Sequence, residues 1–185
     1  MNKRANSRYQ SSKIAFCGLM TALSVTLMLT GGIIPIATYA VPMIAGVLLL
    51  PILLEYGKKS AWTSFAAVSL IVLLLGIDKE AAFFYIFLGY YPIIKWDIER
   101  IPKKFLKLTT KLVLFNLSLV VMYAILGTVL NMDAIIQEFS QMGAVLMIVF
   151  VLVLNLCLFL YDRLMLPLVY LYASRISPKL KFLRH

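Results

Sequence analysis

The chain has 185 residues, of which 62% are hydrophobic, and its mean hydropathy is +0.93. This apolar share is far above that of a soluble domain and indicates a protein that lies almost entirely in a membrane. The formal net charge of +10 would favour nucleic-acid binding in a soluble protein. In a membrane protein, cytoplasmic basic loops and anionic lipid headgroups explain the same charge, so we expect lipids and no nucleic acid as partners.

The apolar segments predict one all-α domain, residues 1–185, with six transmembrane helices in a compact bundle. A helix needs about 20 residues to cross a hydrocarbon core of about 30 Å. The second and fourth spans are short, so the fourth either borrows the charged residues before it or packs inside the bundle. Residues 164–172 either continue the sixth helix or lie at the interface. The expected spans are residues 14–34, 39–54, 61–77, 81–95, 108–130 and 142–161.

The basic residues predict the orientation of these spans. Of the eighteen lysines and arginines, seventeen fall on one side of the six-span arrangement, and Lys79 alone falls on the other. Basic loops are retained in the cytoplasm, so both termini, with basic tails at 1–13 and 173–185, are expected inside. The predicted location is the bacterial plasma membrane.

Few groups in the sequence are suited to chemistry. The single histidine is the terminal His185, and no span carries two carboxylates at helical spacing. GxSxG, Walker and GxGxxG motifs are absent. A membrane-embedded enzyme needs buried acids, bases or metal ligands, so we expect no enzymatic activity, no cofactor and no metal.

Residues 78–95 form the richest polar and aromatic segment. Its outer end carries Asp78, Lys79 and Glu80, and its inner third carries Tyr90 and Tyr91 before a proline. A buried hydroxyl without a partner costs about 1–3 kcal/mol. Two interpretations stay open, namely an interfacial aromatic belt with a proline bend and the lining of a ligand cavity.

The last two spans contain isolated polar residues. Asn116, Tyr123 and Asn155 are expected either to bond between helices or, for Tyr123 above all, to contact a ligand. Asp162 and Arg163 interrupt the sixth span as structural or partner-binding residues.

A pair between Glu55 and Lys95 is possible at the inner ends of the second and fourth spans. In the first span, Ala15, Gly18 and Ala22 form a small-residue stripe that permits close helix approach.

The run 13–23, a lysine followed by small residues and leucines, resembles the first span of substrate-binding S components of energy-coupling factor transporters. The likeness covers the whole chain but is mostly architectural, resting on size, six spans, internal termini and a basic N-terminus. It implies a high-affinity binding subunit for uptake of a vitamin-like small molecule. A coupling transmembrane subunit and two cytoplasmic ATPases would supply the energy.

The resemblance also implies roles for particular residues. The docking face for the coupling subunit would be Ala15, Gly18 and Ala22. An outward-opening cavity is expected between the first outer loop and the last three spans. Nickel and cobalt members begin Met-His, whereas this chain begins Met1-Asn2, so these substrates are set aside. The implied substrate-binding residues are Lys79, Glu80, Phe84, Tyr85, Tyr123 and Asn131.

The main alternative is a structural membrane subunit without a ligand. The membrane subunit of the rod-shape machinery is similar in size and in number of spans. In that case the inner basic loop and the Asp162-Arg163 pair of residues would contact partner proteins. A secondary transporter is disfavoured, because no carboxylate at the membrane centre is available to carry a proton.

Overall fold

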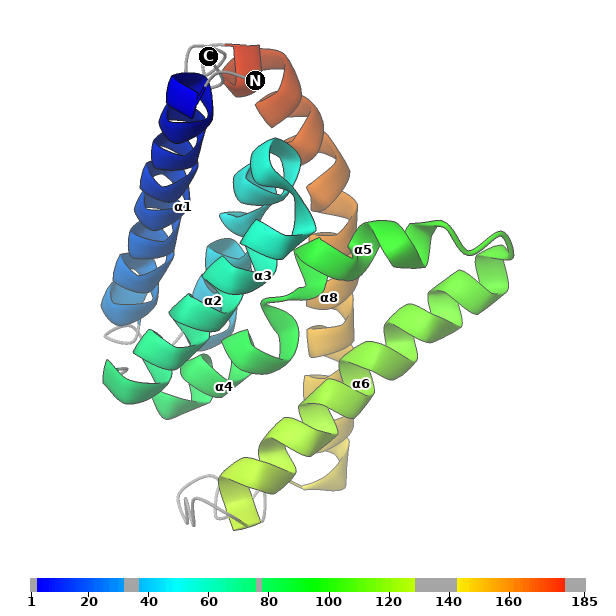
Figure 1. The fold of residues 1–185 in the computed structure, drawn as a ribbon. Coiled ribbons are helices and arrows are strands. Elements are labelled where there is room, and N and C mark those ends of the chain that lie inside the picture. Colours follow the sequence, from blue (N-terminus) through cyan, green and yellow to red (C-terminus); the bar gives the residue numbers. More distant parts are fainter. Residues whose placement is uncertain (1–2, 32–36, 76–77, 129–142, 179–185) are drawn as a thin grey trace. The chain divides into compact units, whose positions relative to one another are not determined.

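The structure, a computed structural model, describes residues 3–31, 37–75, 78–128 and 143–178. Every element in these ranges is a helix, and the predicted all-α class is confirmed (Figure 1). The elements are α1 (Lys3–Gly31), α2 (Ala37–Val47), α3 (Leu49–Leu75), α4 (Lys79–Leu88), α5 (Tyr91–Glu99), α6 (Lys104–Thr128), α8 (Ala144–Leu171) and the π-helical turn η1 (Tyr172–Ile176).

Four helical segments in the described ranges are long and apolar enough to cross a membrane. The chain is therefore a helical membrane protein. Three of these segments correspond to the predicted first, fifth and sixth spans, and the sixth continues through Pro167 instead of ending near residue 161. The four segments are Ser7–Gly31, Leu49–Leu75, Lys104–Thr128 and Val145–Ile176, and the second of them holds two helices joined at Gly57, of which 58–75 is the longer.

The helices belong to two compact units. The first unit consists of Met1–Lys95 together with Met165–His185, and the second consists of Trp96–Leu164. The first outer loop, apart from its ends, and most of the loop before the sixth span lie outside the described residues. The predicted inner loop, 96–107, is helical except at 100–103, because α5 runs on to Glu99 and α6 begins at Lys104.

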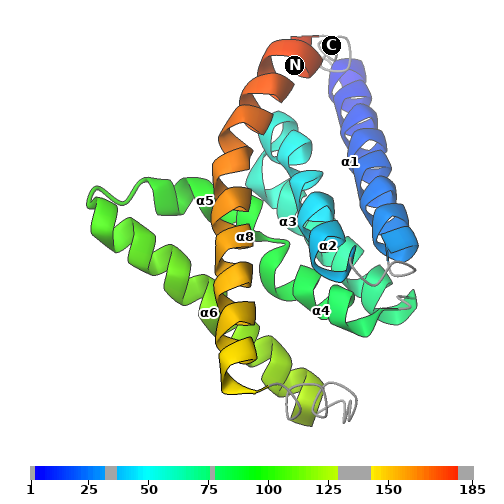
Figure 2. The same cartoon turned by 180° about the vertical axis from the view of Figure 1, so that it is seen from behind.

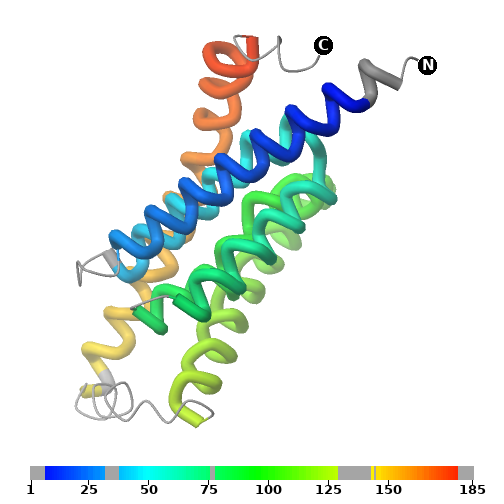
Figure 3. The backbone as a smooth tube through the Cα atoms, turned by 60° about the vertical axis from the view of Figure 1, so that its left-hand side comes forward, coloured from blue at the N-terminus to red at the C-terminus, as the bar shows by residue number. Residues whose placement is uncertain are grey.

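In the first unit, the chain reverses direction at Gly57, within α3. This residue has φ 79° and ψ 177°, a conformation open essentially only to glycine. Residues 49–56 therefore approach the end of the unit where α1 begins, and residues 58–75 return from it (Figures 2 and 3). The predicted short inner loop between the second and third spans corresponds to this reversal.

Two predicted spans are each broken into two helices. The span 39–54 is divided between α2 and the start of α3, and the span 81–95 is divided between α4 and α5. Each break lies four residues before a proline, because α2 ends at Val47 before Pro51 and α4 ends at Leu88 before Pro92. Proline lacks an N–H, and its ring clashes with the carbonyl four residues earlier. Each of these two expected spans therefore contains two helices, and the break before Pro92 agrees with the proline bend considered for the fourth span.

Gly89 fits the second break because the backbone passes close to the preceding helical turn. A Cβ at this position would lie 2.6 Å from the carbonyl oxygen of Tyr85 and 2.7 Å from Cδ2 of its ring. At about 1.5 Å per residue, the 10 residues of α4 extend about 15 Å, half of a hydrocarbon core. Packing inside the unit, the second of the two expectations for this short span, is the one that the structure favours, since Phe84 and Tyr85 are fully buried.

The core of the first unit has two clusters. One joins α1, α2, α3 and α4 around Met28, Val68 and Tyr85. The other joins α1, α3 and α5 around Phe16 and Ile93. Ser24 links α1 to α2, since its hydroxyl donates to the carbonyl oxygens of Met20 in α1 and Ala45 in α2, at 3.0 and 3.3 Å.

The turn at Gly57 also holds the C-terminal part of the first unit. The Glu55 carboxylate accepts hydrogen bonds from the Ser177 hydroxyl at 2.7 Å and from the Tyr172 hydroxyl at 3.3 Å. Lys95, the partner considered from sequence, is itself almost completely buried. The start of α1 and η1 consequently lie at the same end of the unit, and the start of α4 lies at the other (Figure 1).

Substitution of Gly57 by alanine is expected to destabilise the protein by about 1–3 kcal/mol, because an L-residue is strained at this φ and ψ. A Cβ at Gly57 or at Gly18 would meet no atom within 4 Å. A difference in stability between the two alanine variants therefore cannot come from steric clashes. Gly18→Ala, inside α1, is the matched control and should gain up to about 1 kcal/mol. Unfolding of the purified variants in detergent measures both, and equal stability of Gly57→Ala and wild type would contradict the assignment.

Candidate functional site

The start of α4 is joined to the start of α2 by polar side chains. Asp78 caps α4, because its carboxylate accepts from the backbone N–H of Ala81 at 3.0 Å and from the Thr38 hydroxyl at 2.8 Å. The Tyr39 hydroxyl donates to Glu80 at 2.8 Å. We refer to Thr38, Tyr39, Asp78 and Glu80 as the α2–α4 joint. Two of the charges expected at a ligand-binding mouth therefore hold two helices together.

Lys79 and Phe84 are also engaged within the chain. The Lys79 ammonium donates to the carbonyl oxygen of Leu73 at 2.9 Å and satisfies one of the open carbonyls in the last turn of α3. The Phe84 ring is fully buried and packs edge-on against Tyr39 with centroids 5.4 Å apart. The structure thus gives both residues a structural role in the first half of α4.

Tyr85 differs from these residues because its hydroxyl has no hydrogen-bond partner within the described part of the chain. The side chain is 0% exposed and its ring stacks on Phe65 with centroids 5.5 Å apart. A buried hydroxyl without a partner costs about 1–3 kcal/mol. Among the predicted site residues that the structure describes, Tyr85 is the one with a buried polar atom that has no hydrogen-bond partner.

The tyrosines after Tyr85 pack against α3 and the core. Tyr90 stacks on Trp62 at 5.9 Å and meets Phe65 edge-on at the same distance. Tyr91 is completely buried. Packing accounts for the positions of both, and neither is needed to line a cavity.

The two remaining predicted substrate residues belong to other parts of the chain than α4. Tyr123 is half-buried on α6, in the second unit. Asn131 and residues 32–36, which the predicted outward cavity would require, lie outside the described residues. The described part of the predicted site is therefore the run from Lys79 to Tyr85 in α4, together with Tyr123 in α6.

The predicted docking residues lie on the outer surface of α1. Ala15, Gly18 and Ala22 are all exposed, and a Cβ at Gly18 would meet no atom within 4 Å. The core-facing side of the same helix buries Phe16 and Met28. The small-residue stripe is therefore not used to pack α1 against the other described helices of the first unit.

The second unit contains a buried ionic cluster that is not expected from the sequence pattern. The Lys111 ammonium of α6 donates to Asp162 of α8 at 2.7 Å and to Glu99 of α5, and Lys107 donates to Glu99 at 2.8 Å. Lys111 and Asp162 are buried. The charge pattern groups Lys111 with the inner loop, although the residue falls inside the predicted fifth span. A cation and a carboxylate within apolar helices must pair, and that is the signal that could have revealed them.

One further contact joins α6 and α8, and another lies within α8. The side-chain amides of Asn116 and Asn155 bond reciprocally at 2.9 and 3.1 Å, which confirms bonding between helices as the use of these residues. The Arg163 guanidinium lies 5.1 Å from the centre of the Phe159 ring. Asp162 and Arg163, adjacent in sequence, therefore have different partners.

No cluster of three or more His, Cys, Asp or Glu side chains that could hold a metal ion occurs in the ranges that the structure describes. In comparisons with known proteins, no family model, no curated protein and no solved structure matches the chain.

Lys111→Met is expected to destabilise the protein by about 3–5 kcal/mol, because Asp162 and Glu99 lose their shared buried cation. Lys104→Met, at an exposed position on the same helix, controls for the loss of one charge. The double variant Lys111→Met with Asp162→Leu should recover part of the loss, because no carboxylate then remains unpaired at position 162. Unfolding of the purified variants in detergent measures the free energy of unfolding of each. Equal losses for Lys111→Met and Lys104→Met would disprove the role of the cluster.

Proposed function

We propose that this chain is a membrane-embedded, high-affinity binding subunit for uptake of a vitamin-like small molecule. A separate coupling transmembrane subunit and two cytoplasmic ATPases would energise it. The chain would contribute recognition of the solute and a surface for the coupling subunit, and it would have no enzymatic role of its own. Its resemblance to the S components of energy-coupling factor transporters is the origin of this proposal.

The observation that carries the proposal is the exposed small-residue face of α1. Ala15, Gly18 and Ala22 leave the backbone of a long apolar helix accessible over two turns. Helices in membranes associate where small residues let backbones approach closely, since lipid offers no hydrophobic driving force between them. A face of this kind, directed away from the core of its own chain, suits a subunit that docks to another membrane protein.

The Tyr85 hydroxyl supports the recognition part of the proposal. It lies fully buried in α4, near the outer end expected from the charge pattern, and has no partner in the described residues. A polar group of a bound solute would offset the cost of this unsatisfied hydroxyl. The Phe65 ring, which stacks on Tyr85, would supply apolar contact area for a ring-containing solute.

One observation favours the second candidate, a structural membrane subunit without a ligand. Lys79, Glu80 and Phe84 are all occupied by contacts inside the first unit. A subunit of this kind would use the same α1 face for assembly and would need no solute. The two candidates differ in whether the purified protein retains a small molecule.

The recognition of a solute can be tested with Tyr85→Phe. Mass spectrometry measures the small molecules that wild type and this variant retain after gentle purification. Wild type is expected to retain a vitamin-like compound, and Tyr85→Phe should bind it about fivefold more weakly, the value of one hydrogen bond of about 1 kcal/mol. Without ligand the same variant should be as stable as wild type or more stable, because it removes an unsatisfied hydroxyl.

Tyr170→Phe, which removes an exposed hydroxyl, is the matched control and should change neither the retention of the compound nor the stability of the protein. If wild type retains no compound and Tyr85→Phe only gains stability, the structural-subunit candidate replaces the binding subunit.

The docking prediction concerns Gly18→Leu and Ala22→Leu. A leucine on this face would keep a partner helix from close approach, so co-purification of a coupling subunit and its ATPases should fall at least about tenfold. Retention of the small molecule should be unchanged. Ala66→Leu, at an exposed position on α3, adds the same side chain elsewhere and should leave association intact. Normal assembly of the two α1 variants would show that the face is not the docking surface.

A further inference from the structure

The first unit has a cavity that the proposed function does not use. It lies between α1 and α3, close to the turn at Gly57, and has a volume of about 230 Å³. The exposure of Ile14, Lys59 and Thr63 shows that the cavity is open at the protein surface. Its lining includes Lys13 and Ile14 from α1 and Lys59, Ser60, Thr63 and Ser64 from α3.

Three hydrogen-bond donors of the lining are not committed to other groups. Neither the Lys13 nor the Lys59 ammonium pairs with a carboxylate among the residues that the structure describes. Ser64 is 4% exposed, and its hydroxyl likewise has no partner in the described ranges. By contrast, the hydroxyls of Ser60 and Thr63 donate to backbone carbonyls of their own helix, at 3.1 and 2.9 Å.

Two cations and a buried donor around one small cavity favour an anion with several acceptor oxygens. A phosphate group has three such oxygens and forms strong charge-assisted hydrogen bonds with lysine. The volume is below the roughly 300–1,000 Å³ of pockets that enclose drug-sized ligands, so it suits a compact charged group and not a whole vitamin. The lysine stems and Ile14 provide an apolar side for a hydrocarbon chain.

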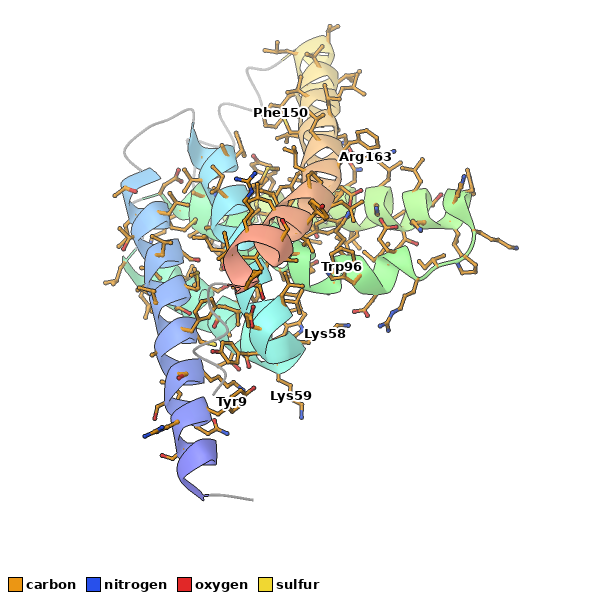
Figure 4. All side chains as sticks on the ribbon, turned by 90° about the horizontal axis from the view of Figure 1, so that it is seen from above. Tyr9, Lys58, Lys59, Trp96, Phe150 and Arg163 are labelled. Carbon is orange, nitrogen blue, oxygen red and sulfur yellow. The ribbon has the colours of Figure 1, made fainter. Side chains whose placement is uncertain are left out.

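The location also favours a ligand from the membrane surface. Lys13 and Lys59 belong to the basic residues expected at the inner side, where anionic lipids attract lysine and arginine. Figure 4 shows Lys58 and Lys59 leaving the turn in different directions, with Lys59 on the side of Tyr9 in α1. The Tyr9 and Tyr56 rings, 6.0 Å apart, hold α1 beside this turn.

We propose that this cavity is a binding site for a phosphate-bearing anion, with Lys13, Lys59 and Ser64 as its donors. The phosphate can come from the headgroup of an anionic phospholipid or from free phosphate. The site would anchor the α1–α3 side of the protein in the inner leaflet, independently of any transported solute.

The test reconstitutes the full chain in nanodiscs of phosphatidylcholine and titrates in phosphatidylglycerol, with bound lipid counted by native mass spectrometry. Removal of a lysine near an anionic surface costs about 1 kcal/mol, or about fivefold in affinity. Lys13→Gln and Lys59→Gln should each weaken phosphatidylglycerol binding about fivefold. Ser64→Ala, which leaves the charge unchanged, should also weaken it measurably. In phosphatidylcholine alone, the two lysine variants should be as stable as wild type, and Ser64→Ala should be as stable or more stable, because it removes an unsatisfied hydroxyl.

Lys58→Gln is the matched control, because it removes the same charge from the neighbouring residue, which does not line the cavity. It should change binding less than twofold. Equal losses for the Lys58 and Lys59 variants, with no effect of Ser64→Ala, would show a diffuse surface field and overturn the site.

A second arm titrates inorganic phosphate in phosphatidylcholine nanodiscs and follows thermal stability. Stabilisation that depends on Lys13, Lys59 and Ser64 would assign the site to free phosphate, whereas stabilisation by phosphatidylglycerol alone would assign it to the lipid headgroup. No dependence on these residues in either arm would refute the proposal.

Discussion

Each polar group in the apolar interior of this chain needs a partner, and the helices of each unit are arranged around the pairs that satisfy this need. Water is absent from a hydrocarbon core, so an unpaired donor or carbonyl costs several kcal/mol there. The α2–α4 joint, the Lys79 bond to the end of α3 and the Lys111 cluster are solutions to this one constraint. The reciprocal Asn116–Asn155 pair is a fourth solution.

The same constraint separates structural residues from candidates for function. Lys79 is the single basic residue expected on the outer side and therefore a natural candidate for a ligand contact. Its bond to the carbonyl of Leu73 explains the residue without a ligand, because that carbonyl has no partner in its own helix. Tyr85 and Ser64 have no such explanation among the described residues, and their hydroxyls mark places where something other than the chain can supply a partner.

The long helices could be predicted from sequence because their signal is local. The apolar runs that form α1, α6 and α8 are each about as long as a membrane crossing, and length and hydropathy are enough to find them. The breaks in the second and fourth spans were also signalled locally, by Pro51 and Pro92, but hydropathy does not register a missing N–H. A proline alone does not place a break, however, because α8 continues through Pro167 and α2 contains Pro42.

The pairs between helices could not be predicted in the same way. Lys111 and Asp162 are 51 residues apart, and Tyr39 and Glu80 are 41 apart. Spacing within one helix cannot select a partner on another, because that choice depends on which faces the apolar residues bury. Sequence could therefore state that Asp162 needed a cation but not which of the basic residues would provide it. This is also why four of the proposed substrate residues shared one helix while their actual contacts remained unknown.

The α1 helix is under the most constraints, because its surface is divided among three environments. Its core-facing side buries Phe16, and the side with Gly18 is exposed and made of small residues. At about 100° per residue, Lys13 lies about 140° around the helix from Gly18, on the flank that faces the cavity. Ile14 lies between them, four residues before Gly18 and therefore on its side of the helix. An anion in the cavity and a helix docked on the small-residue face would meet along this edge, so a change at Ile14 acts on both surfaces, whereas changes at Lys13 or Ala22 act on one.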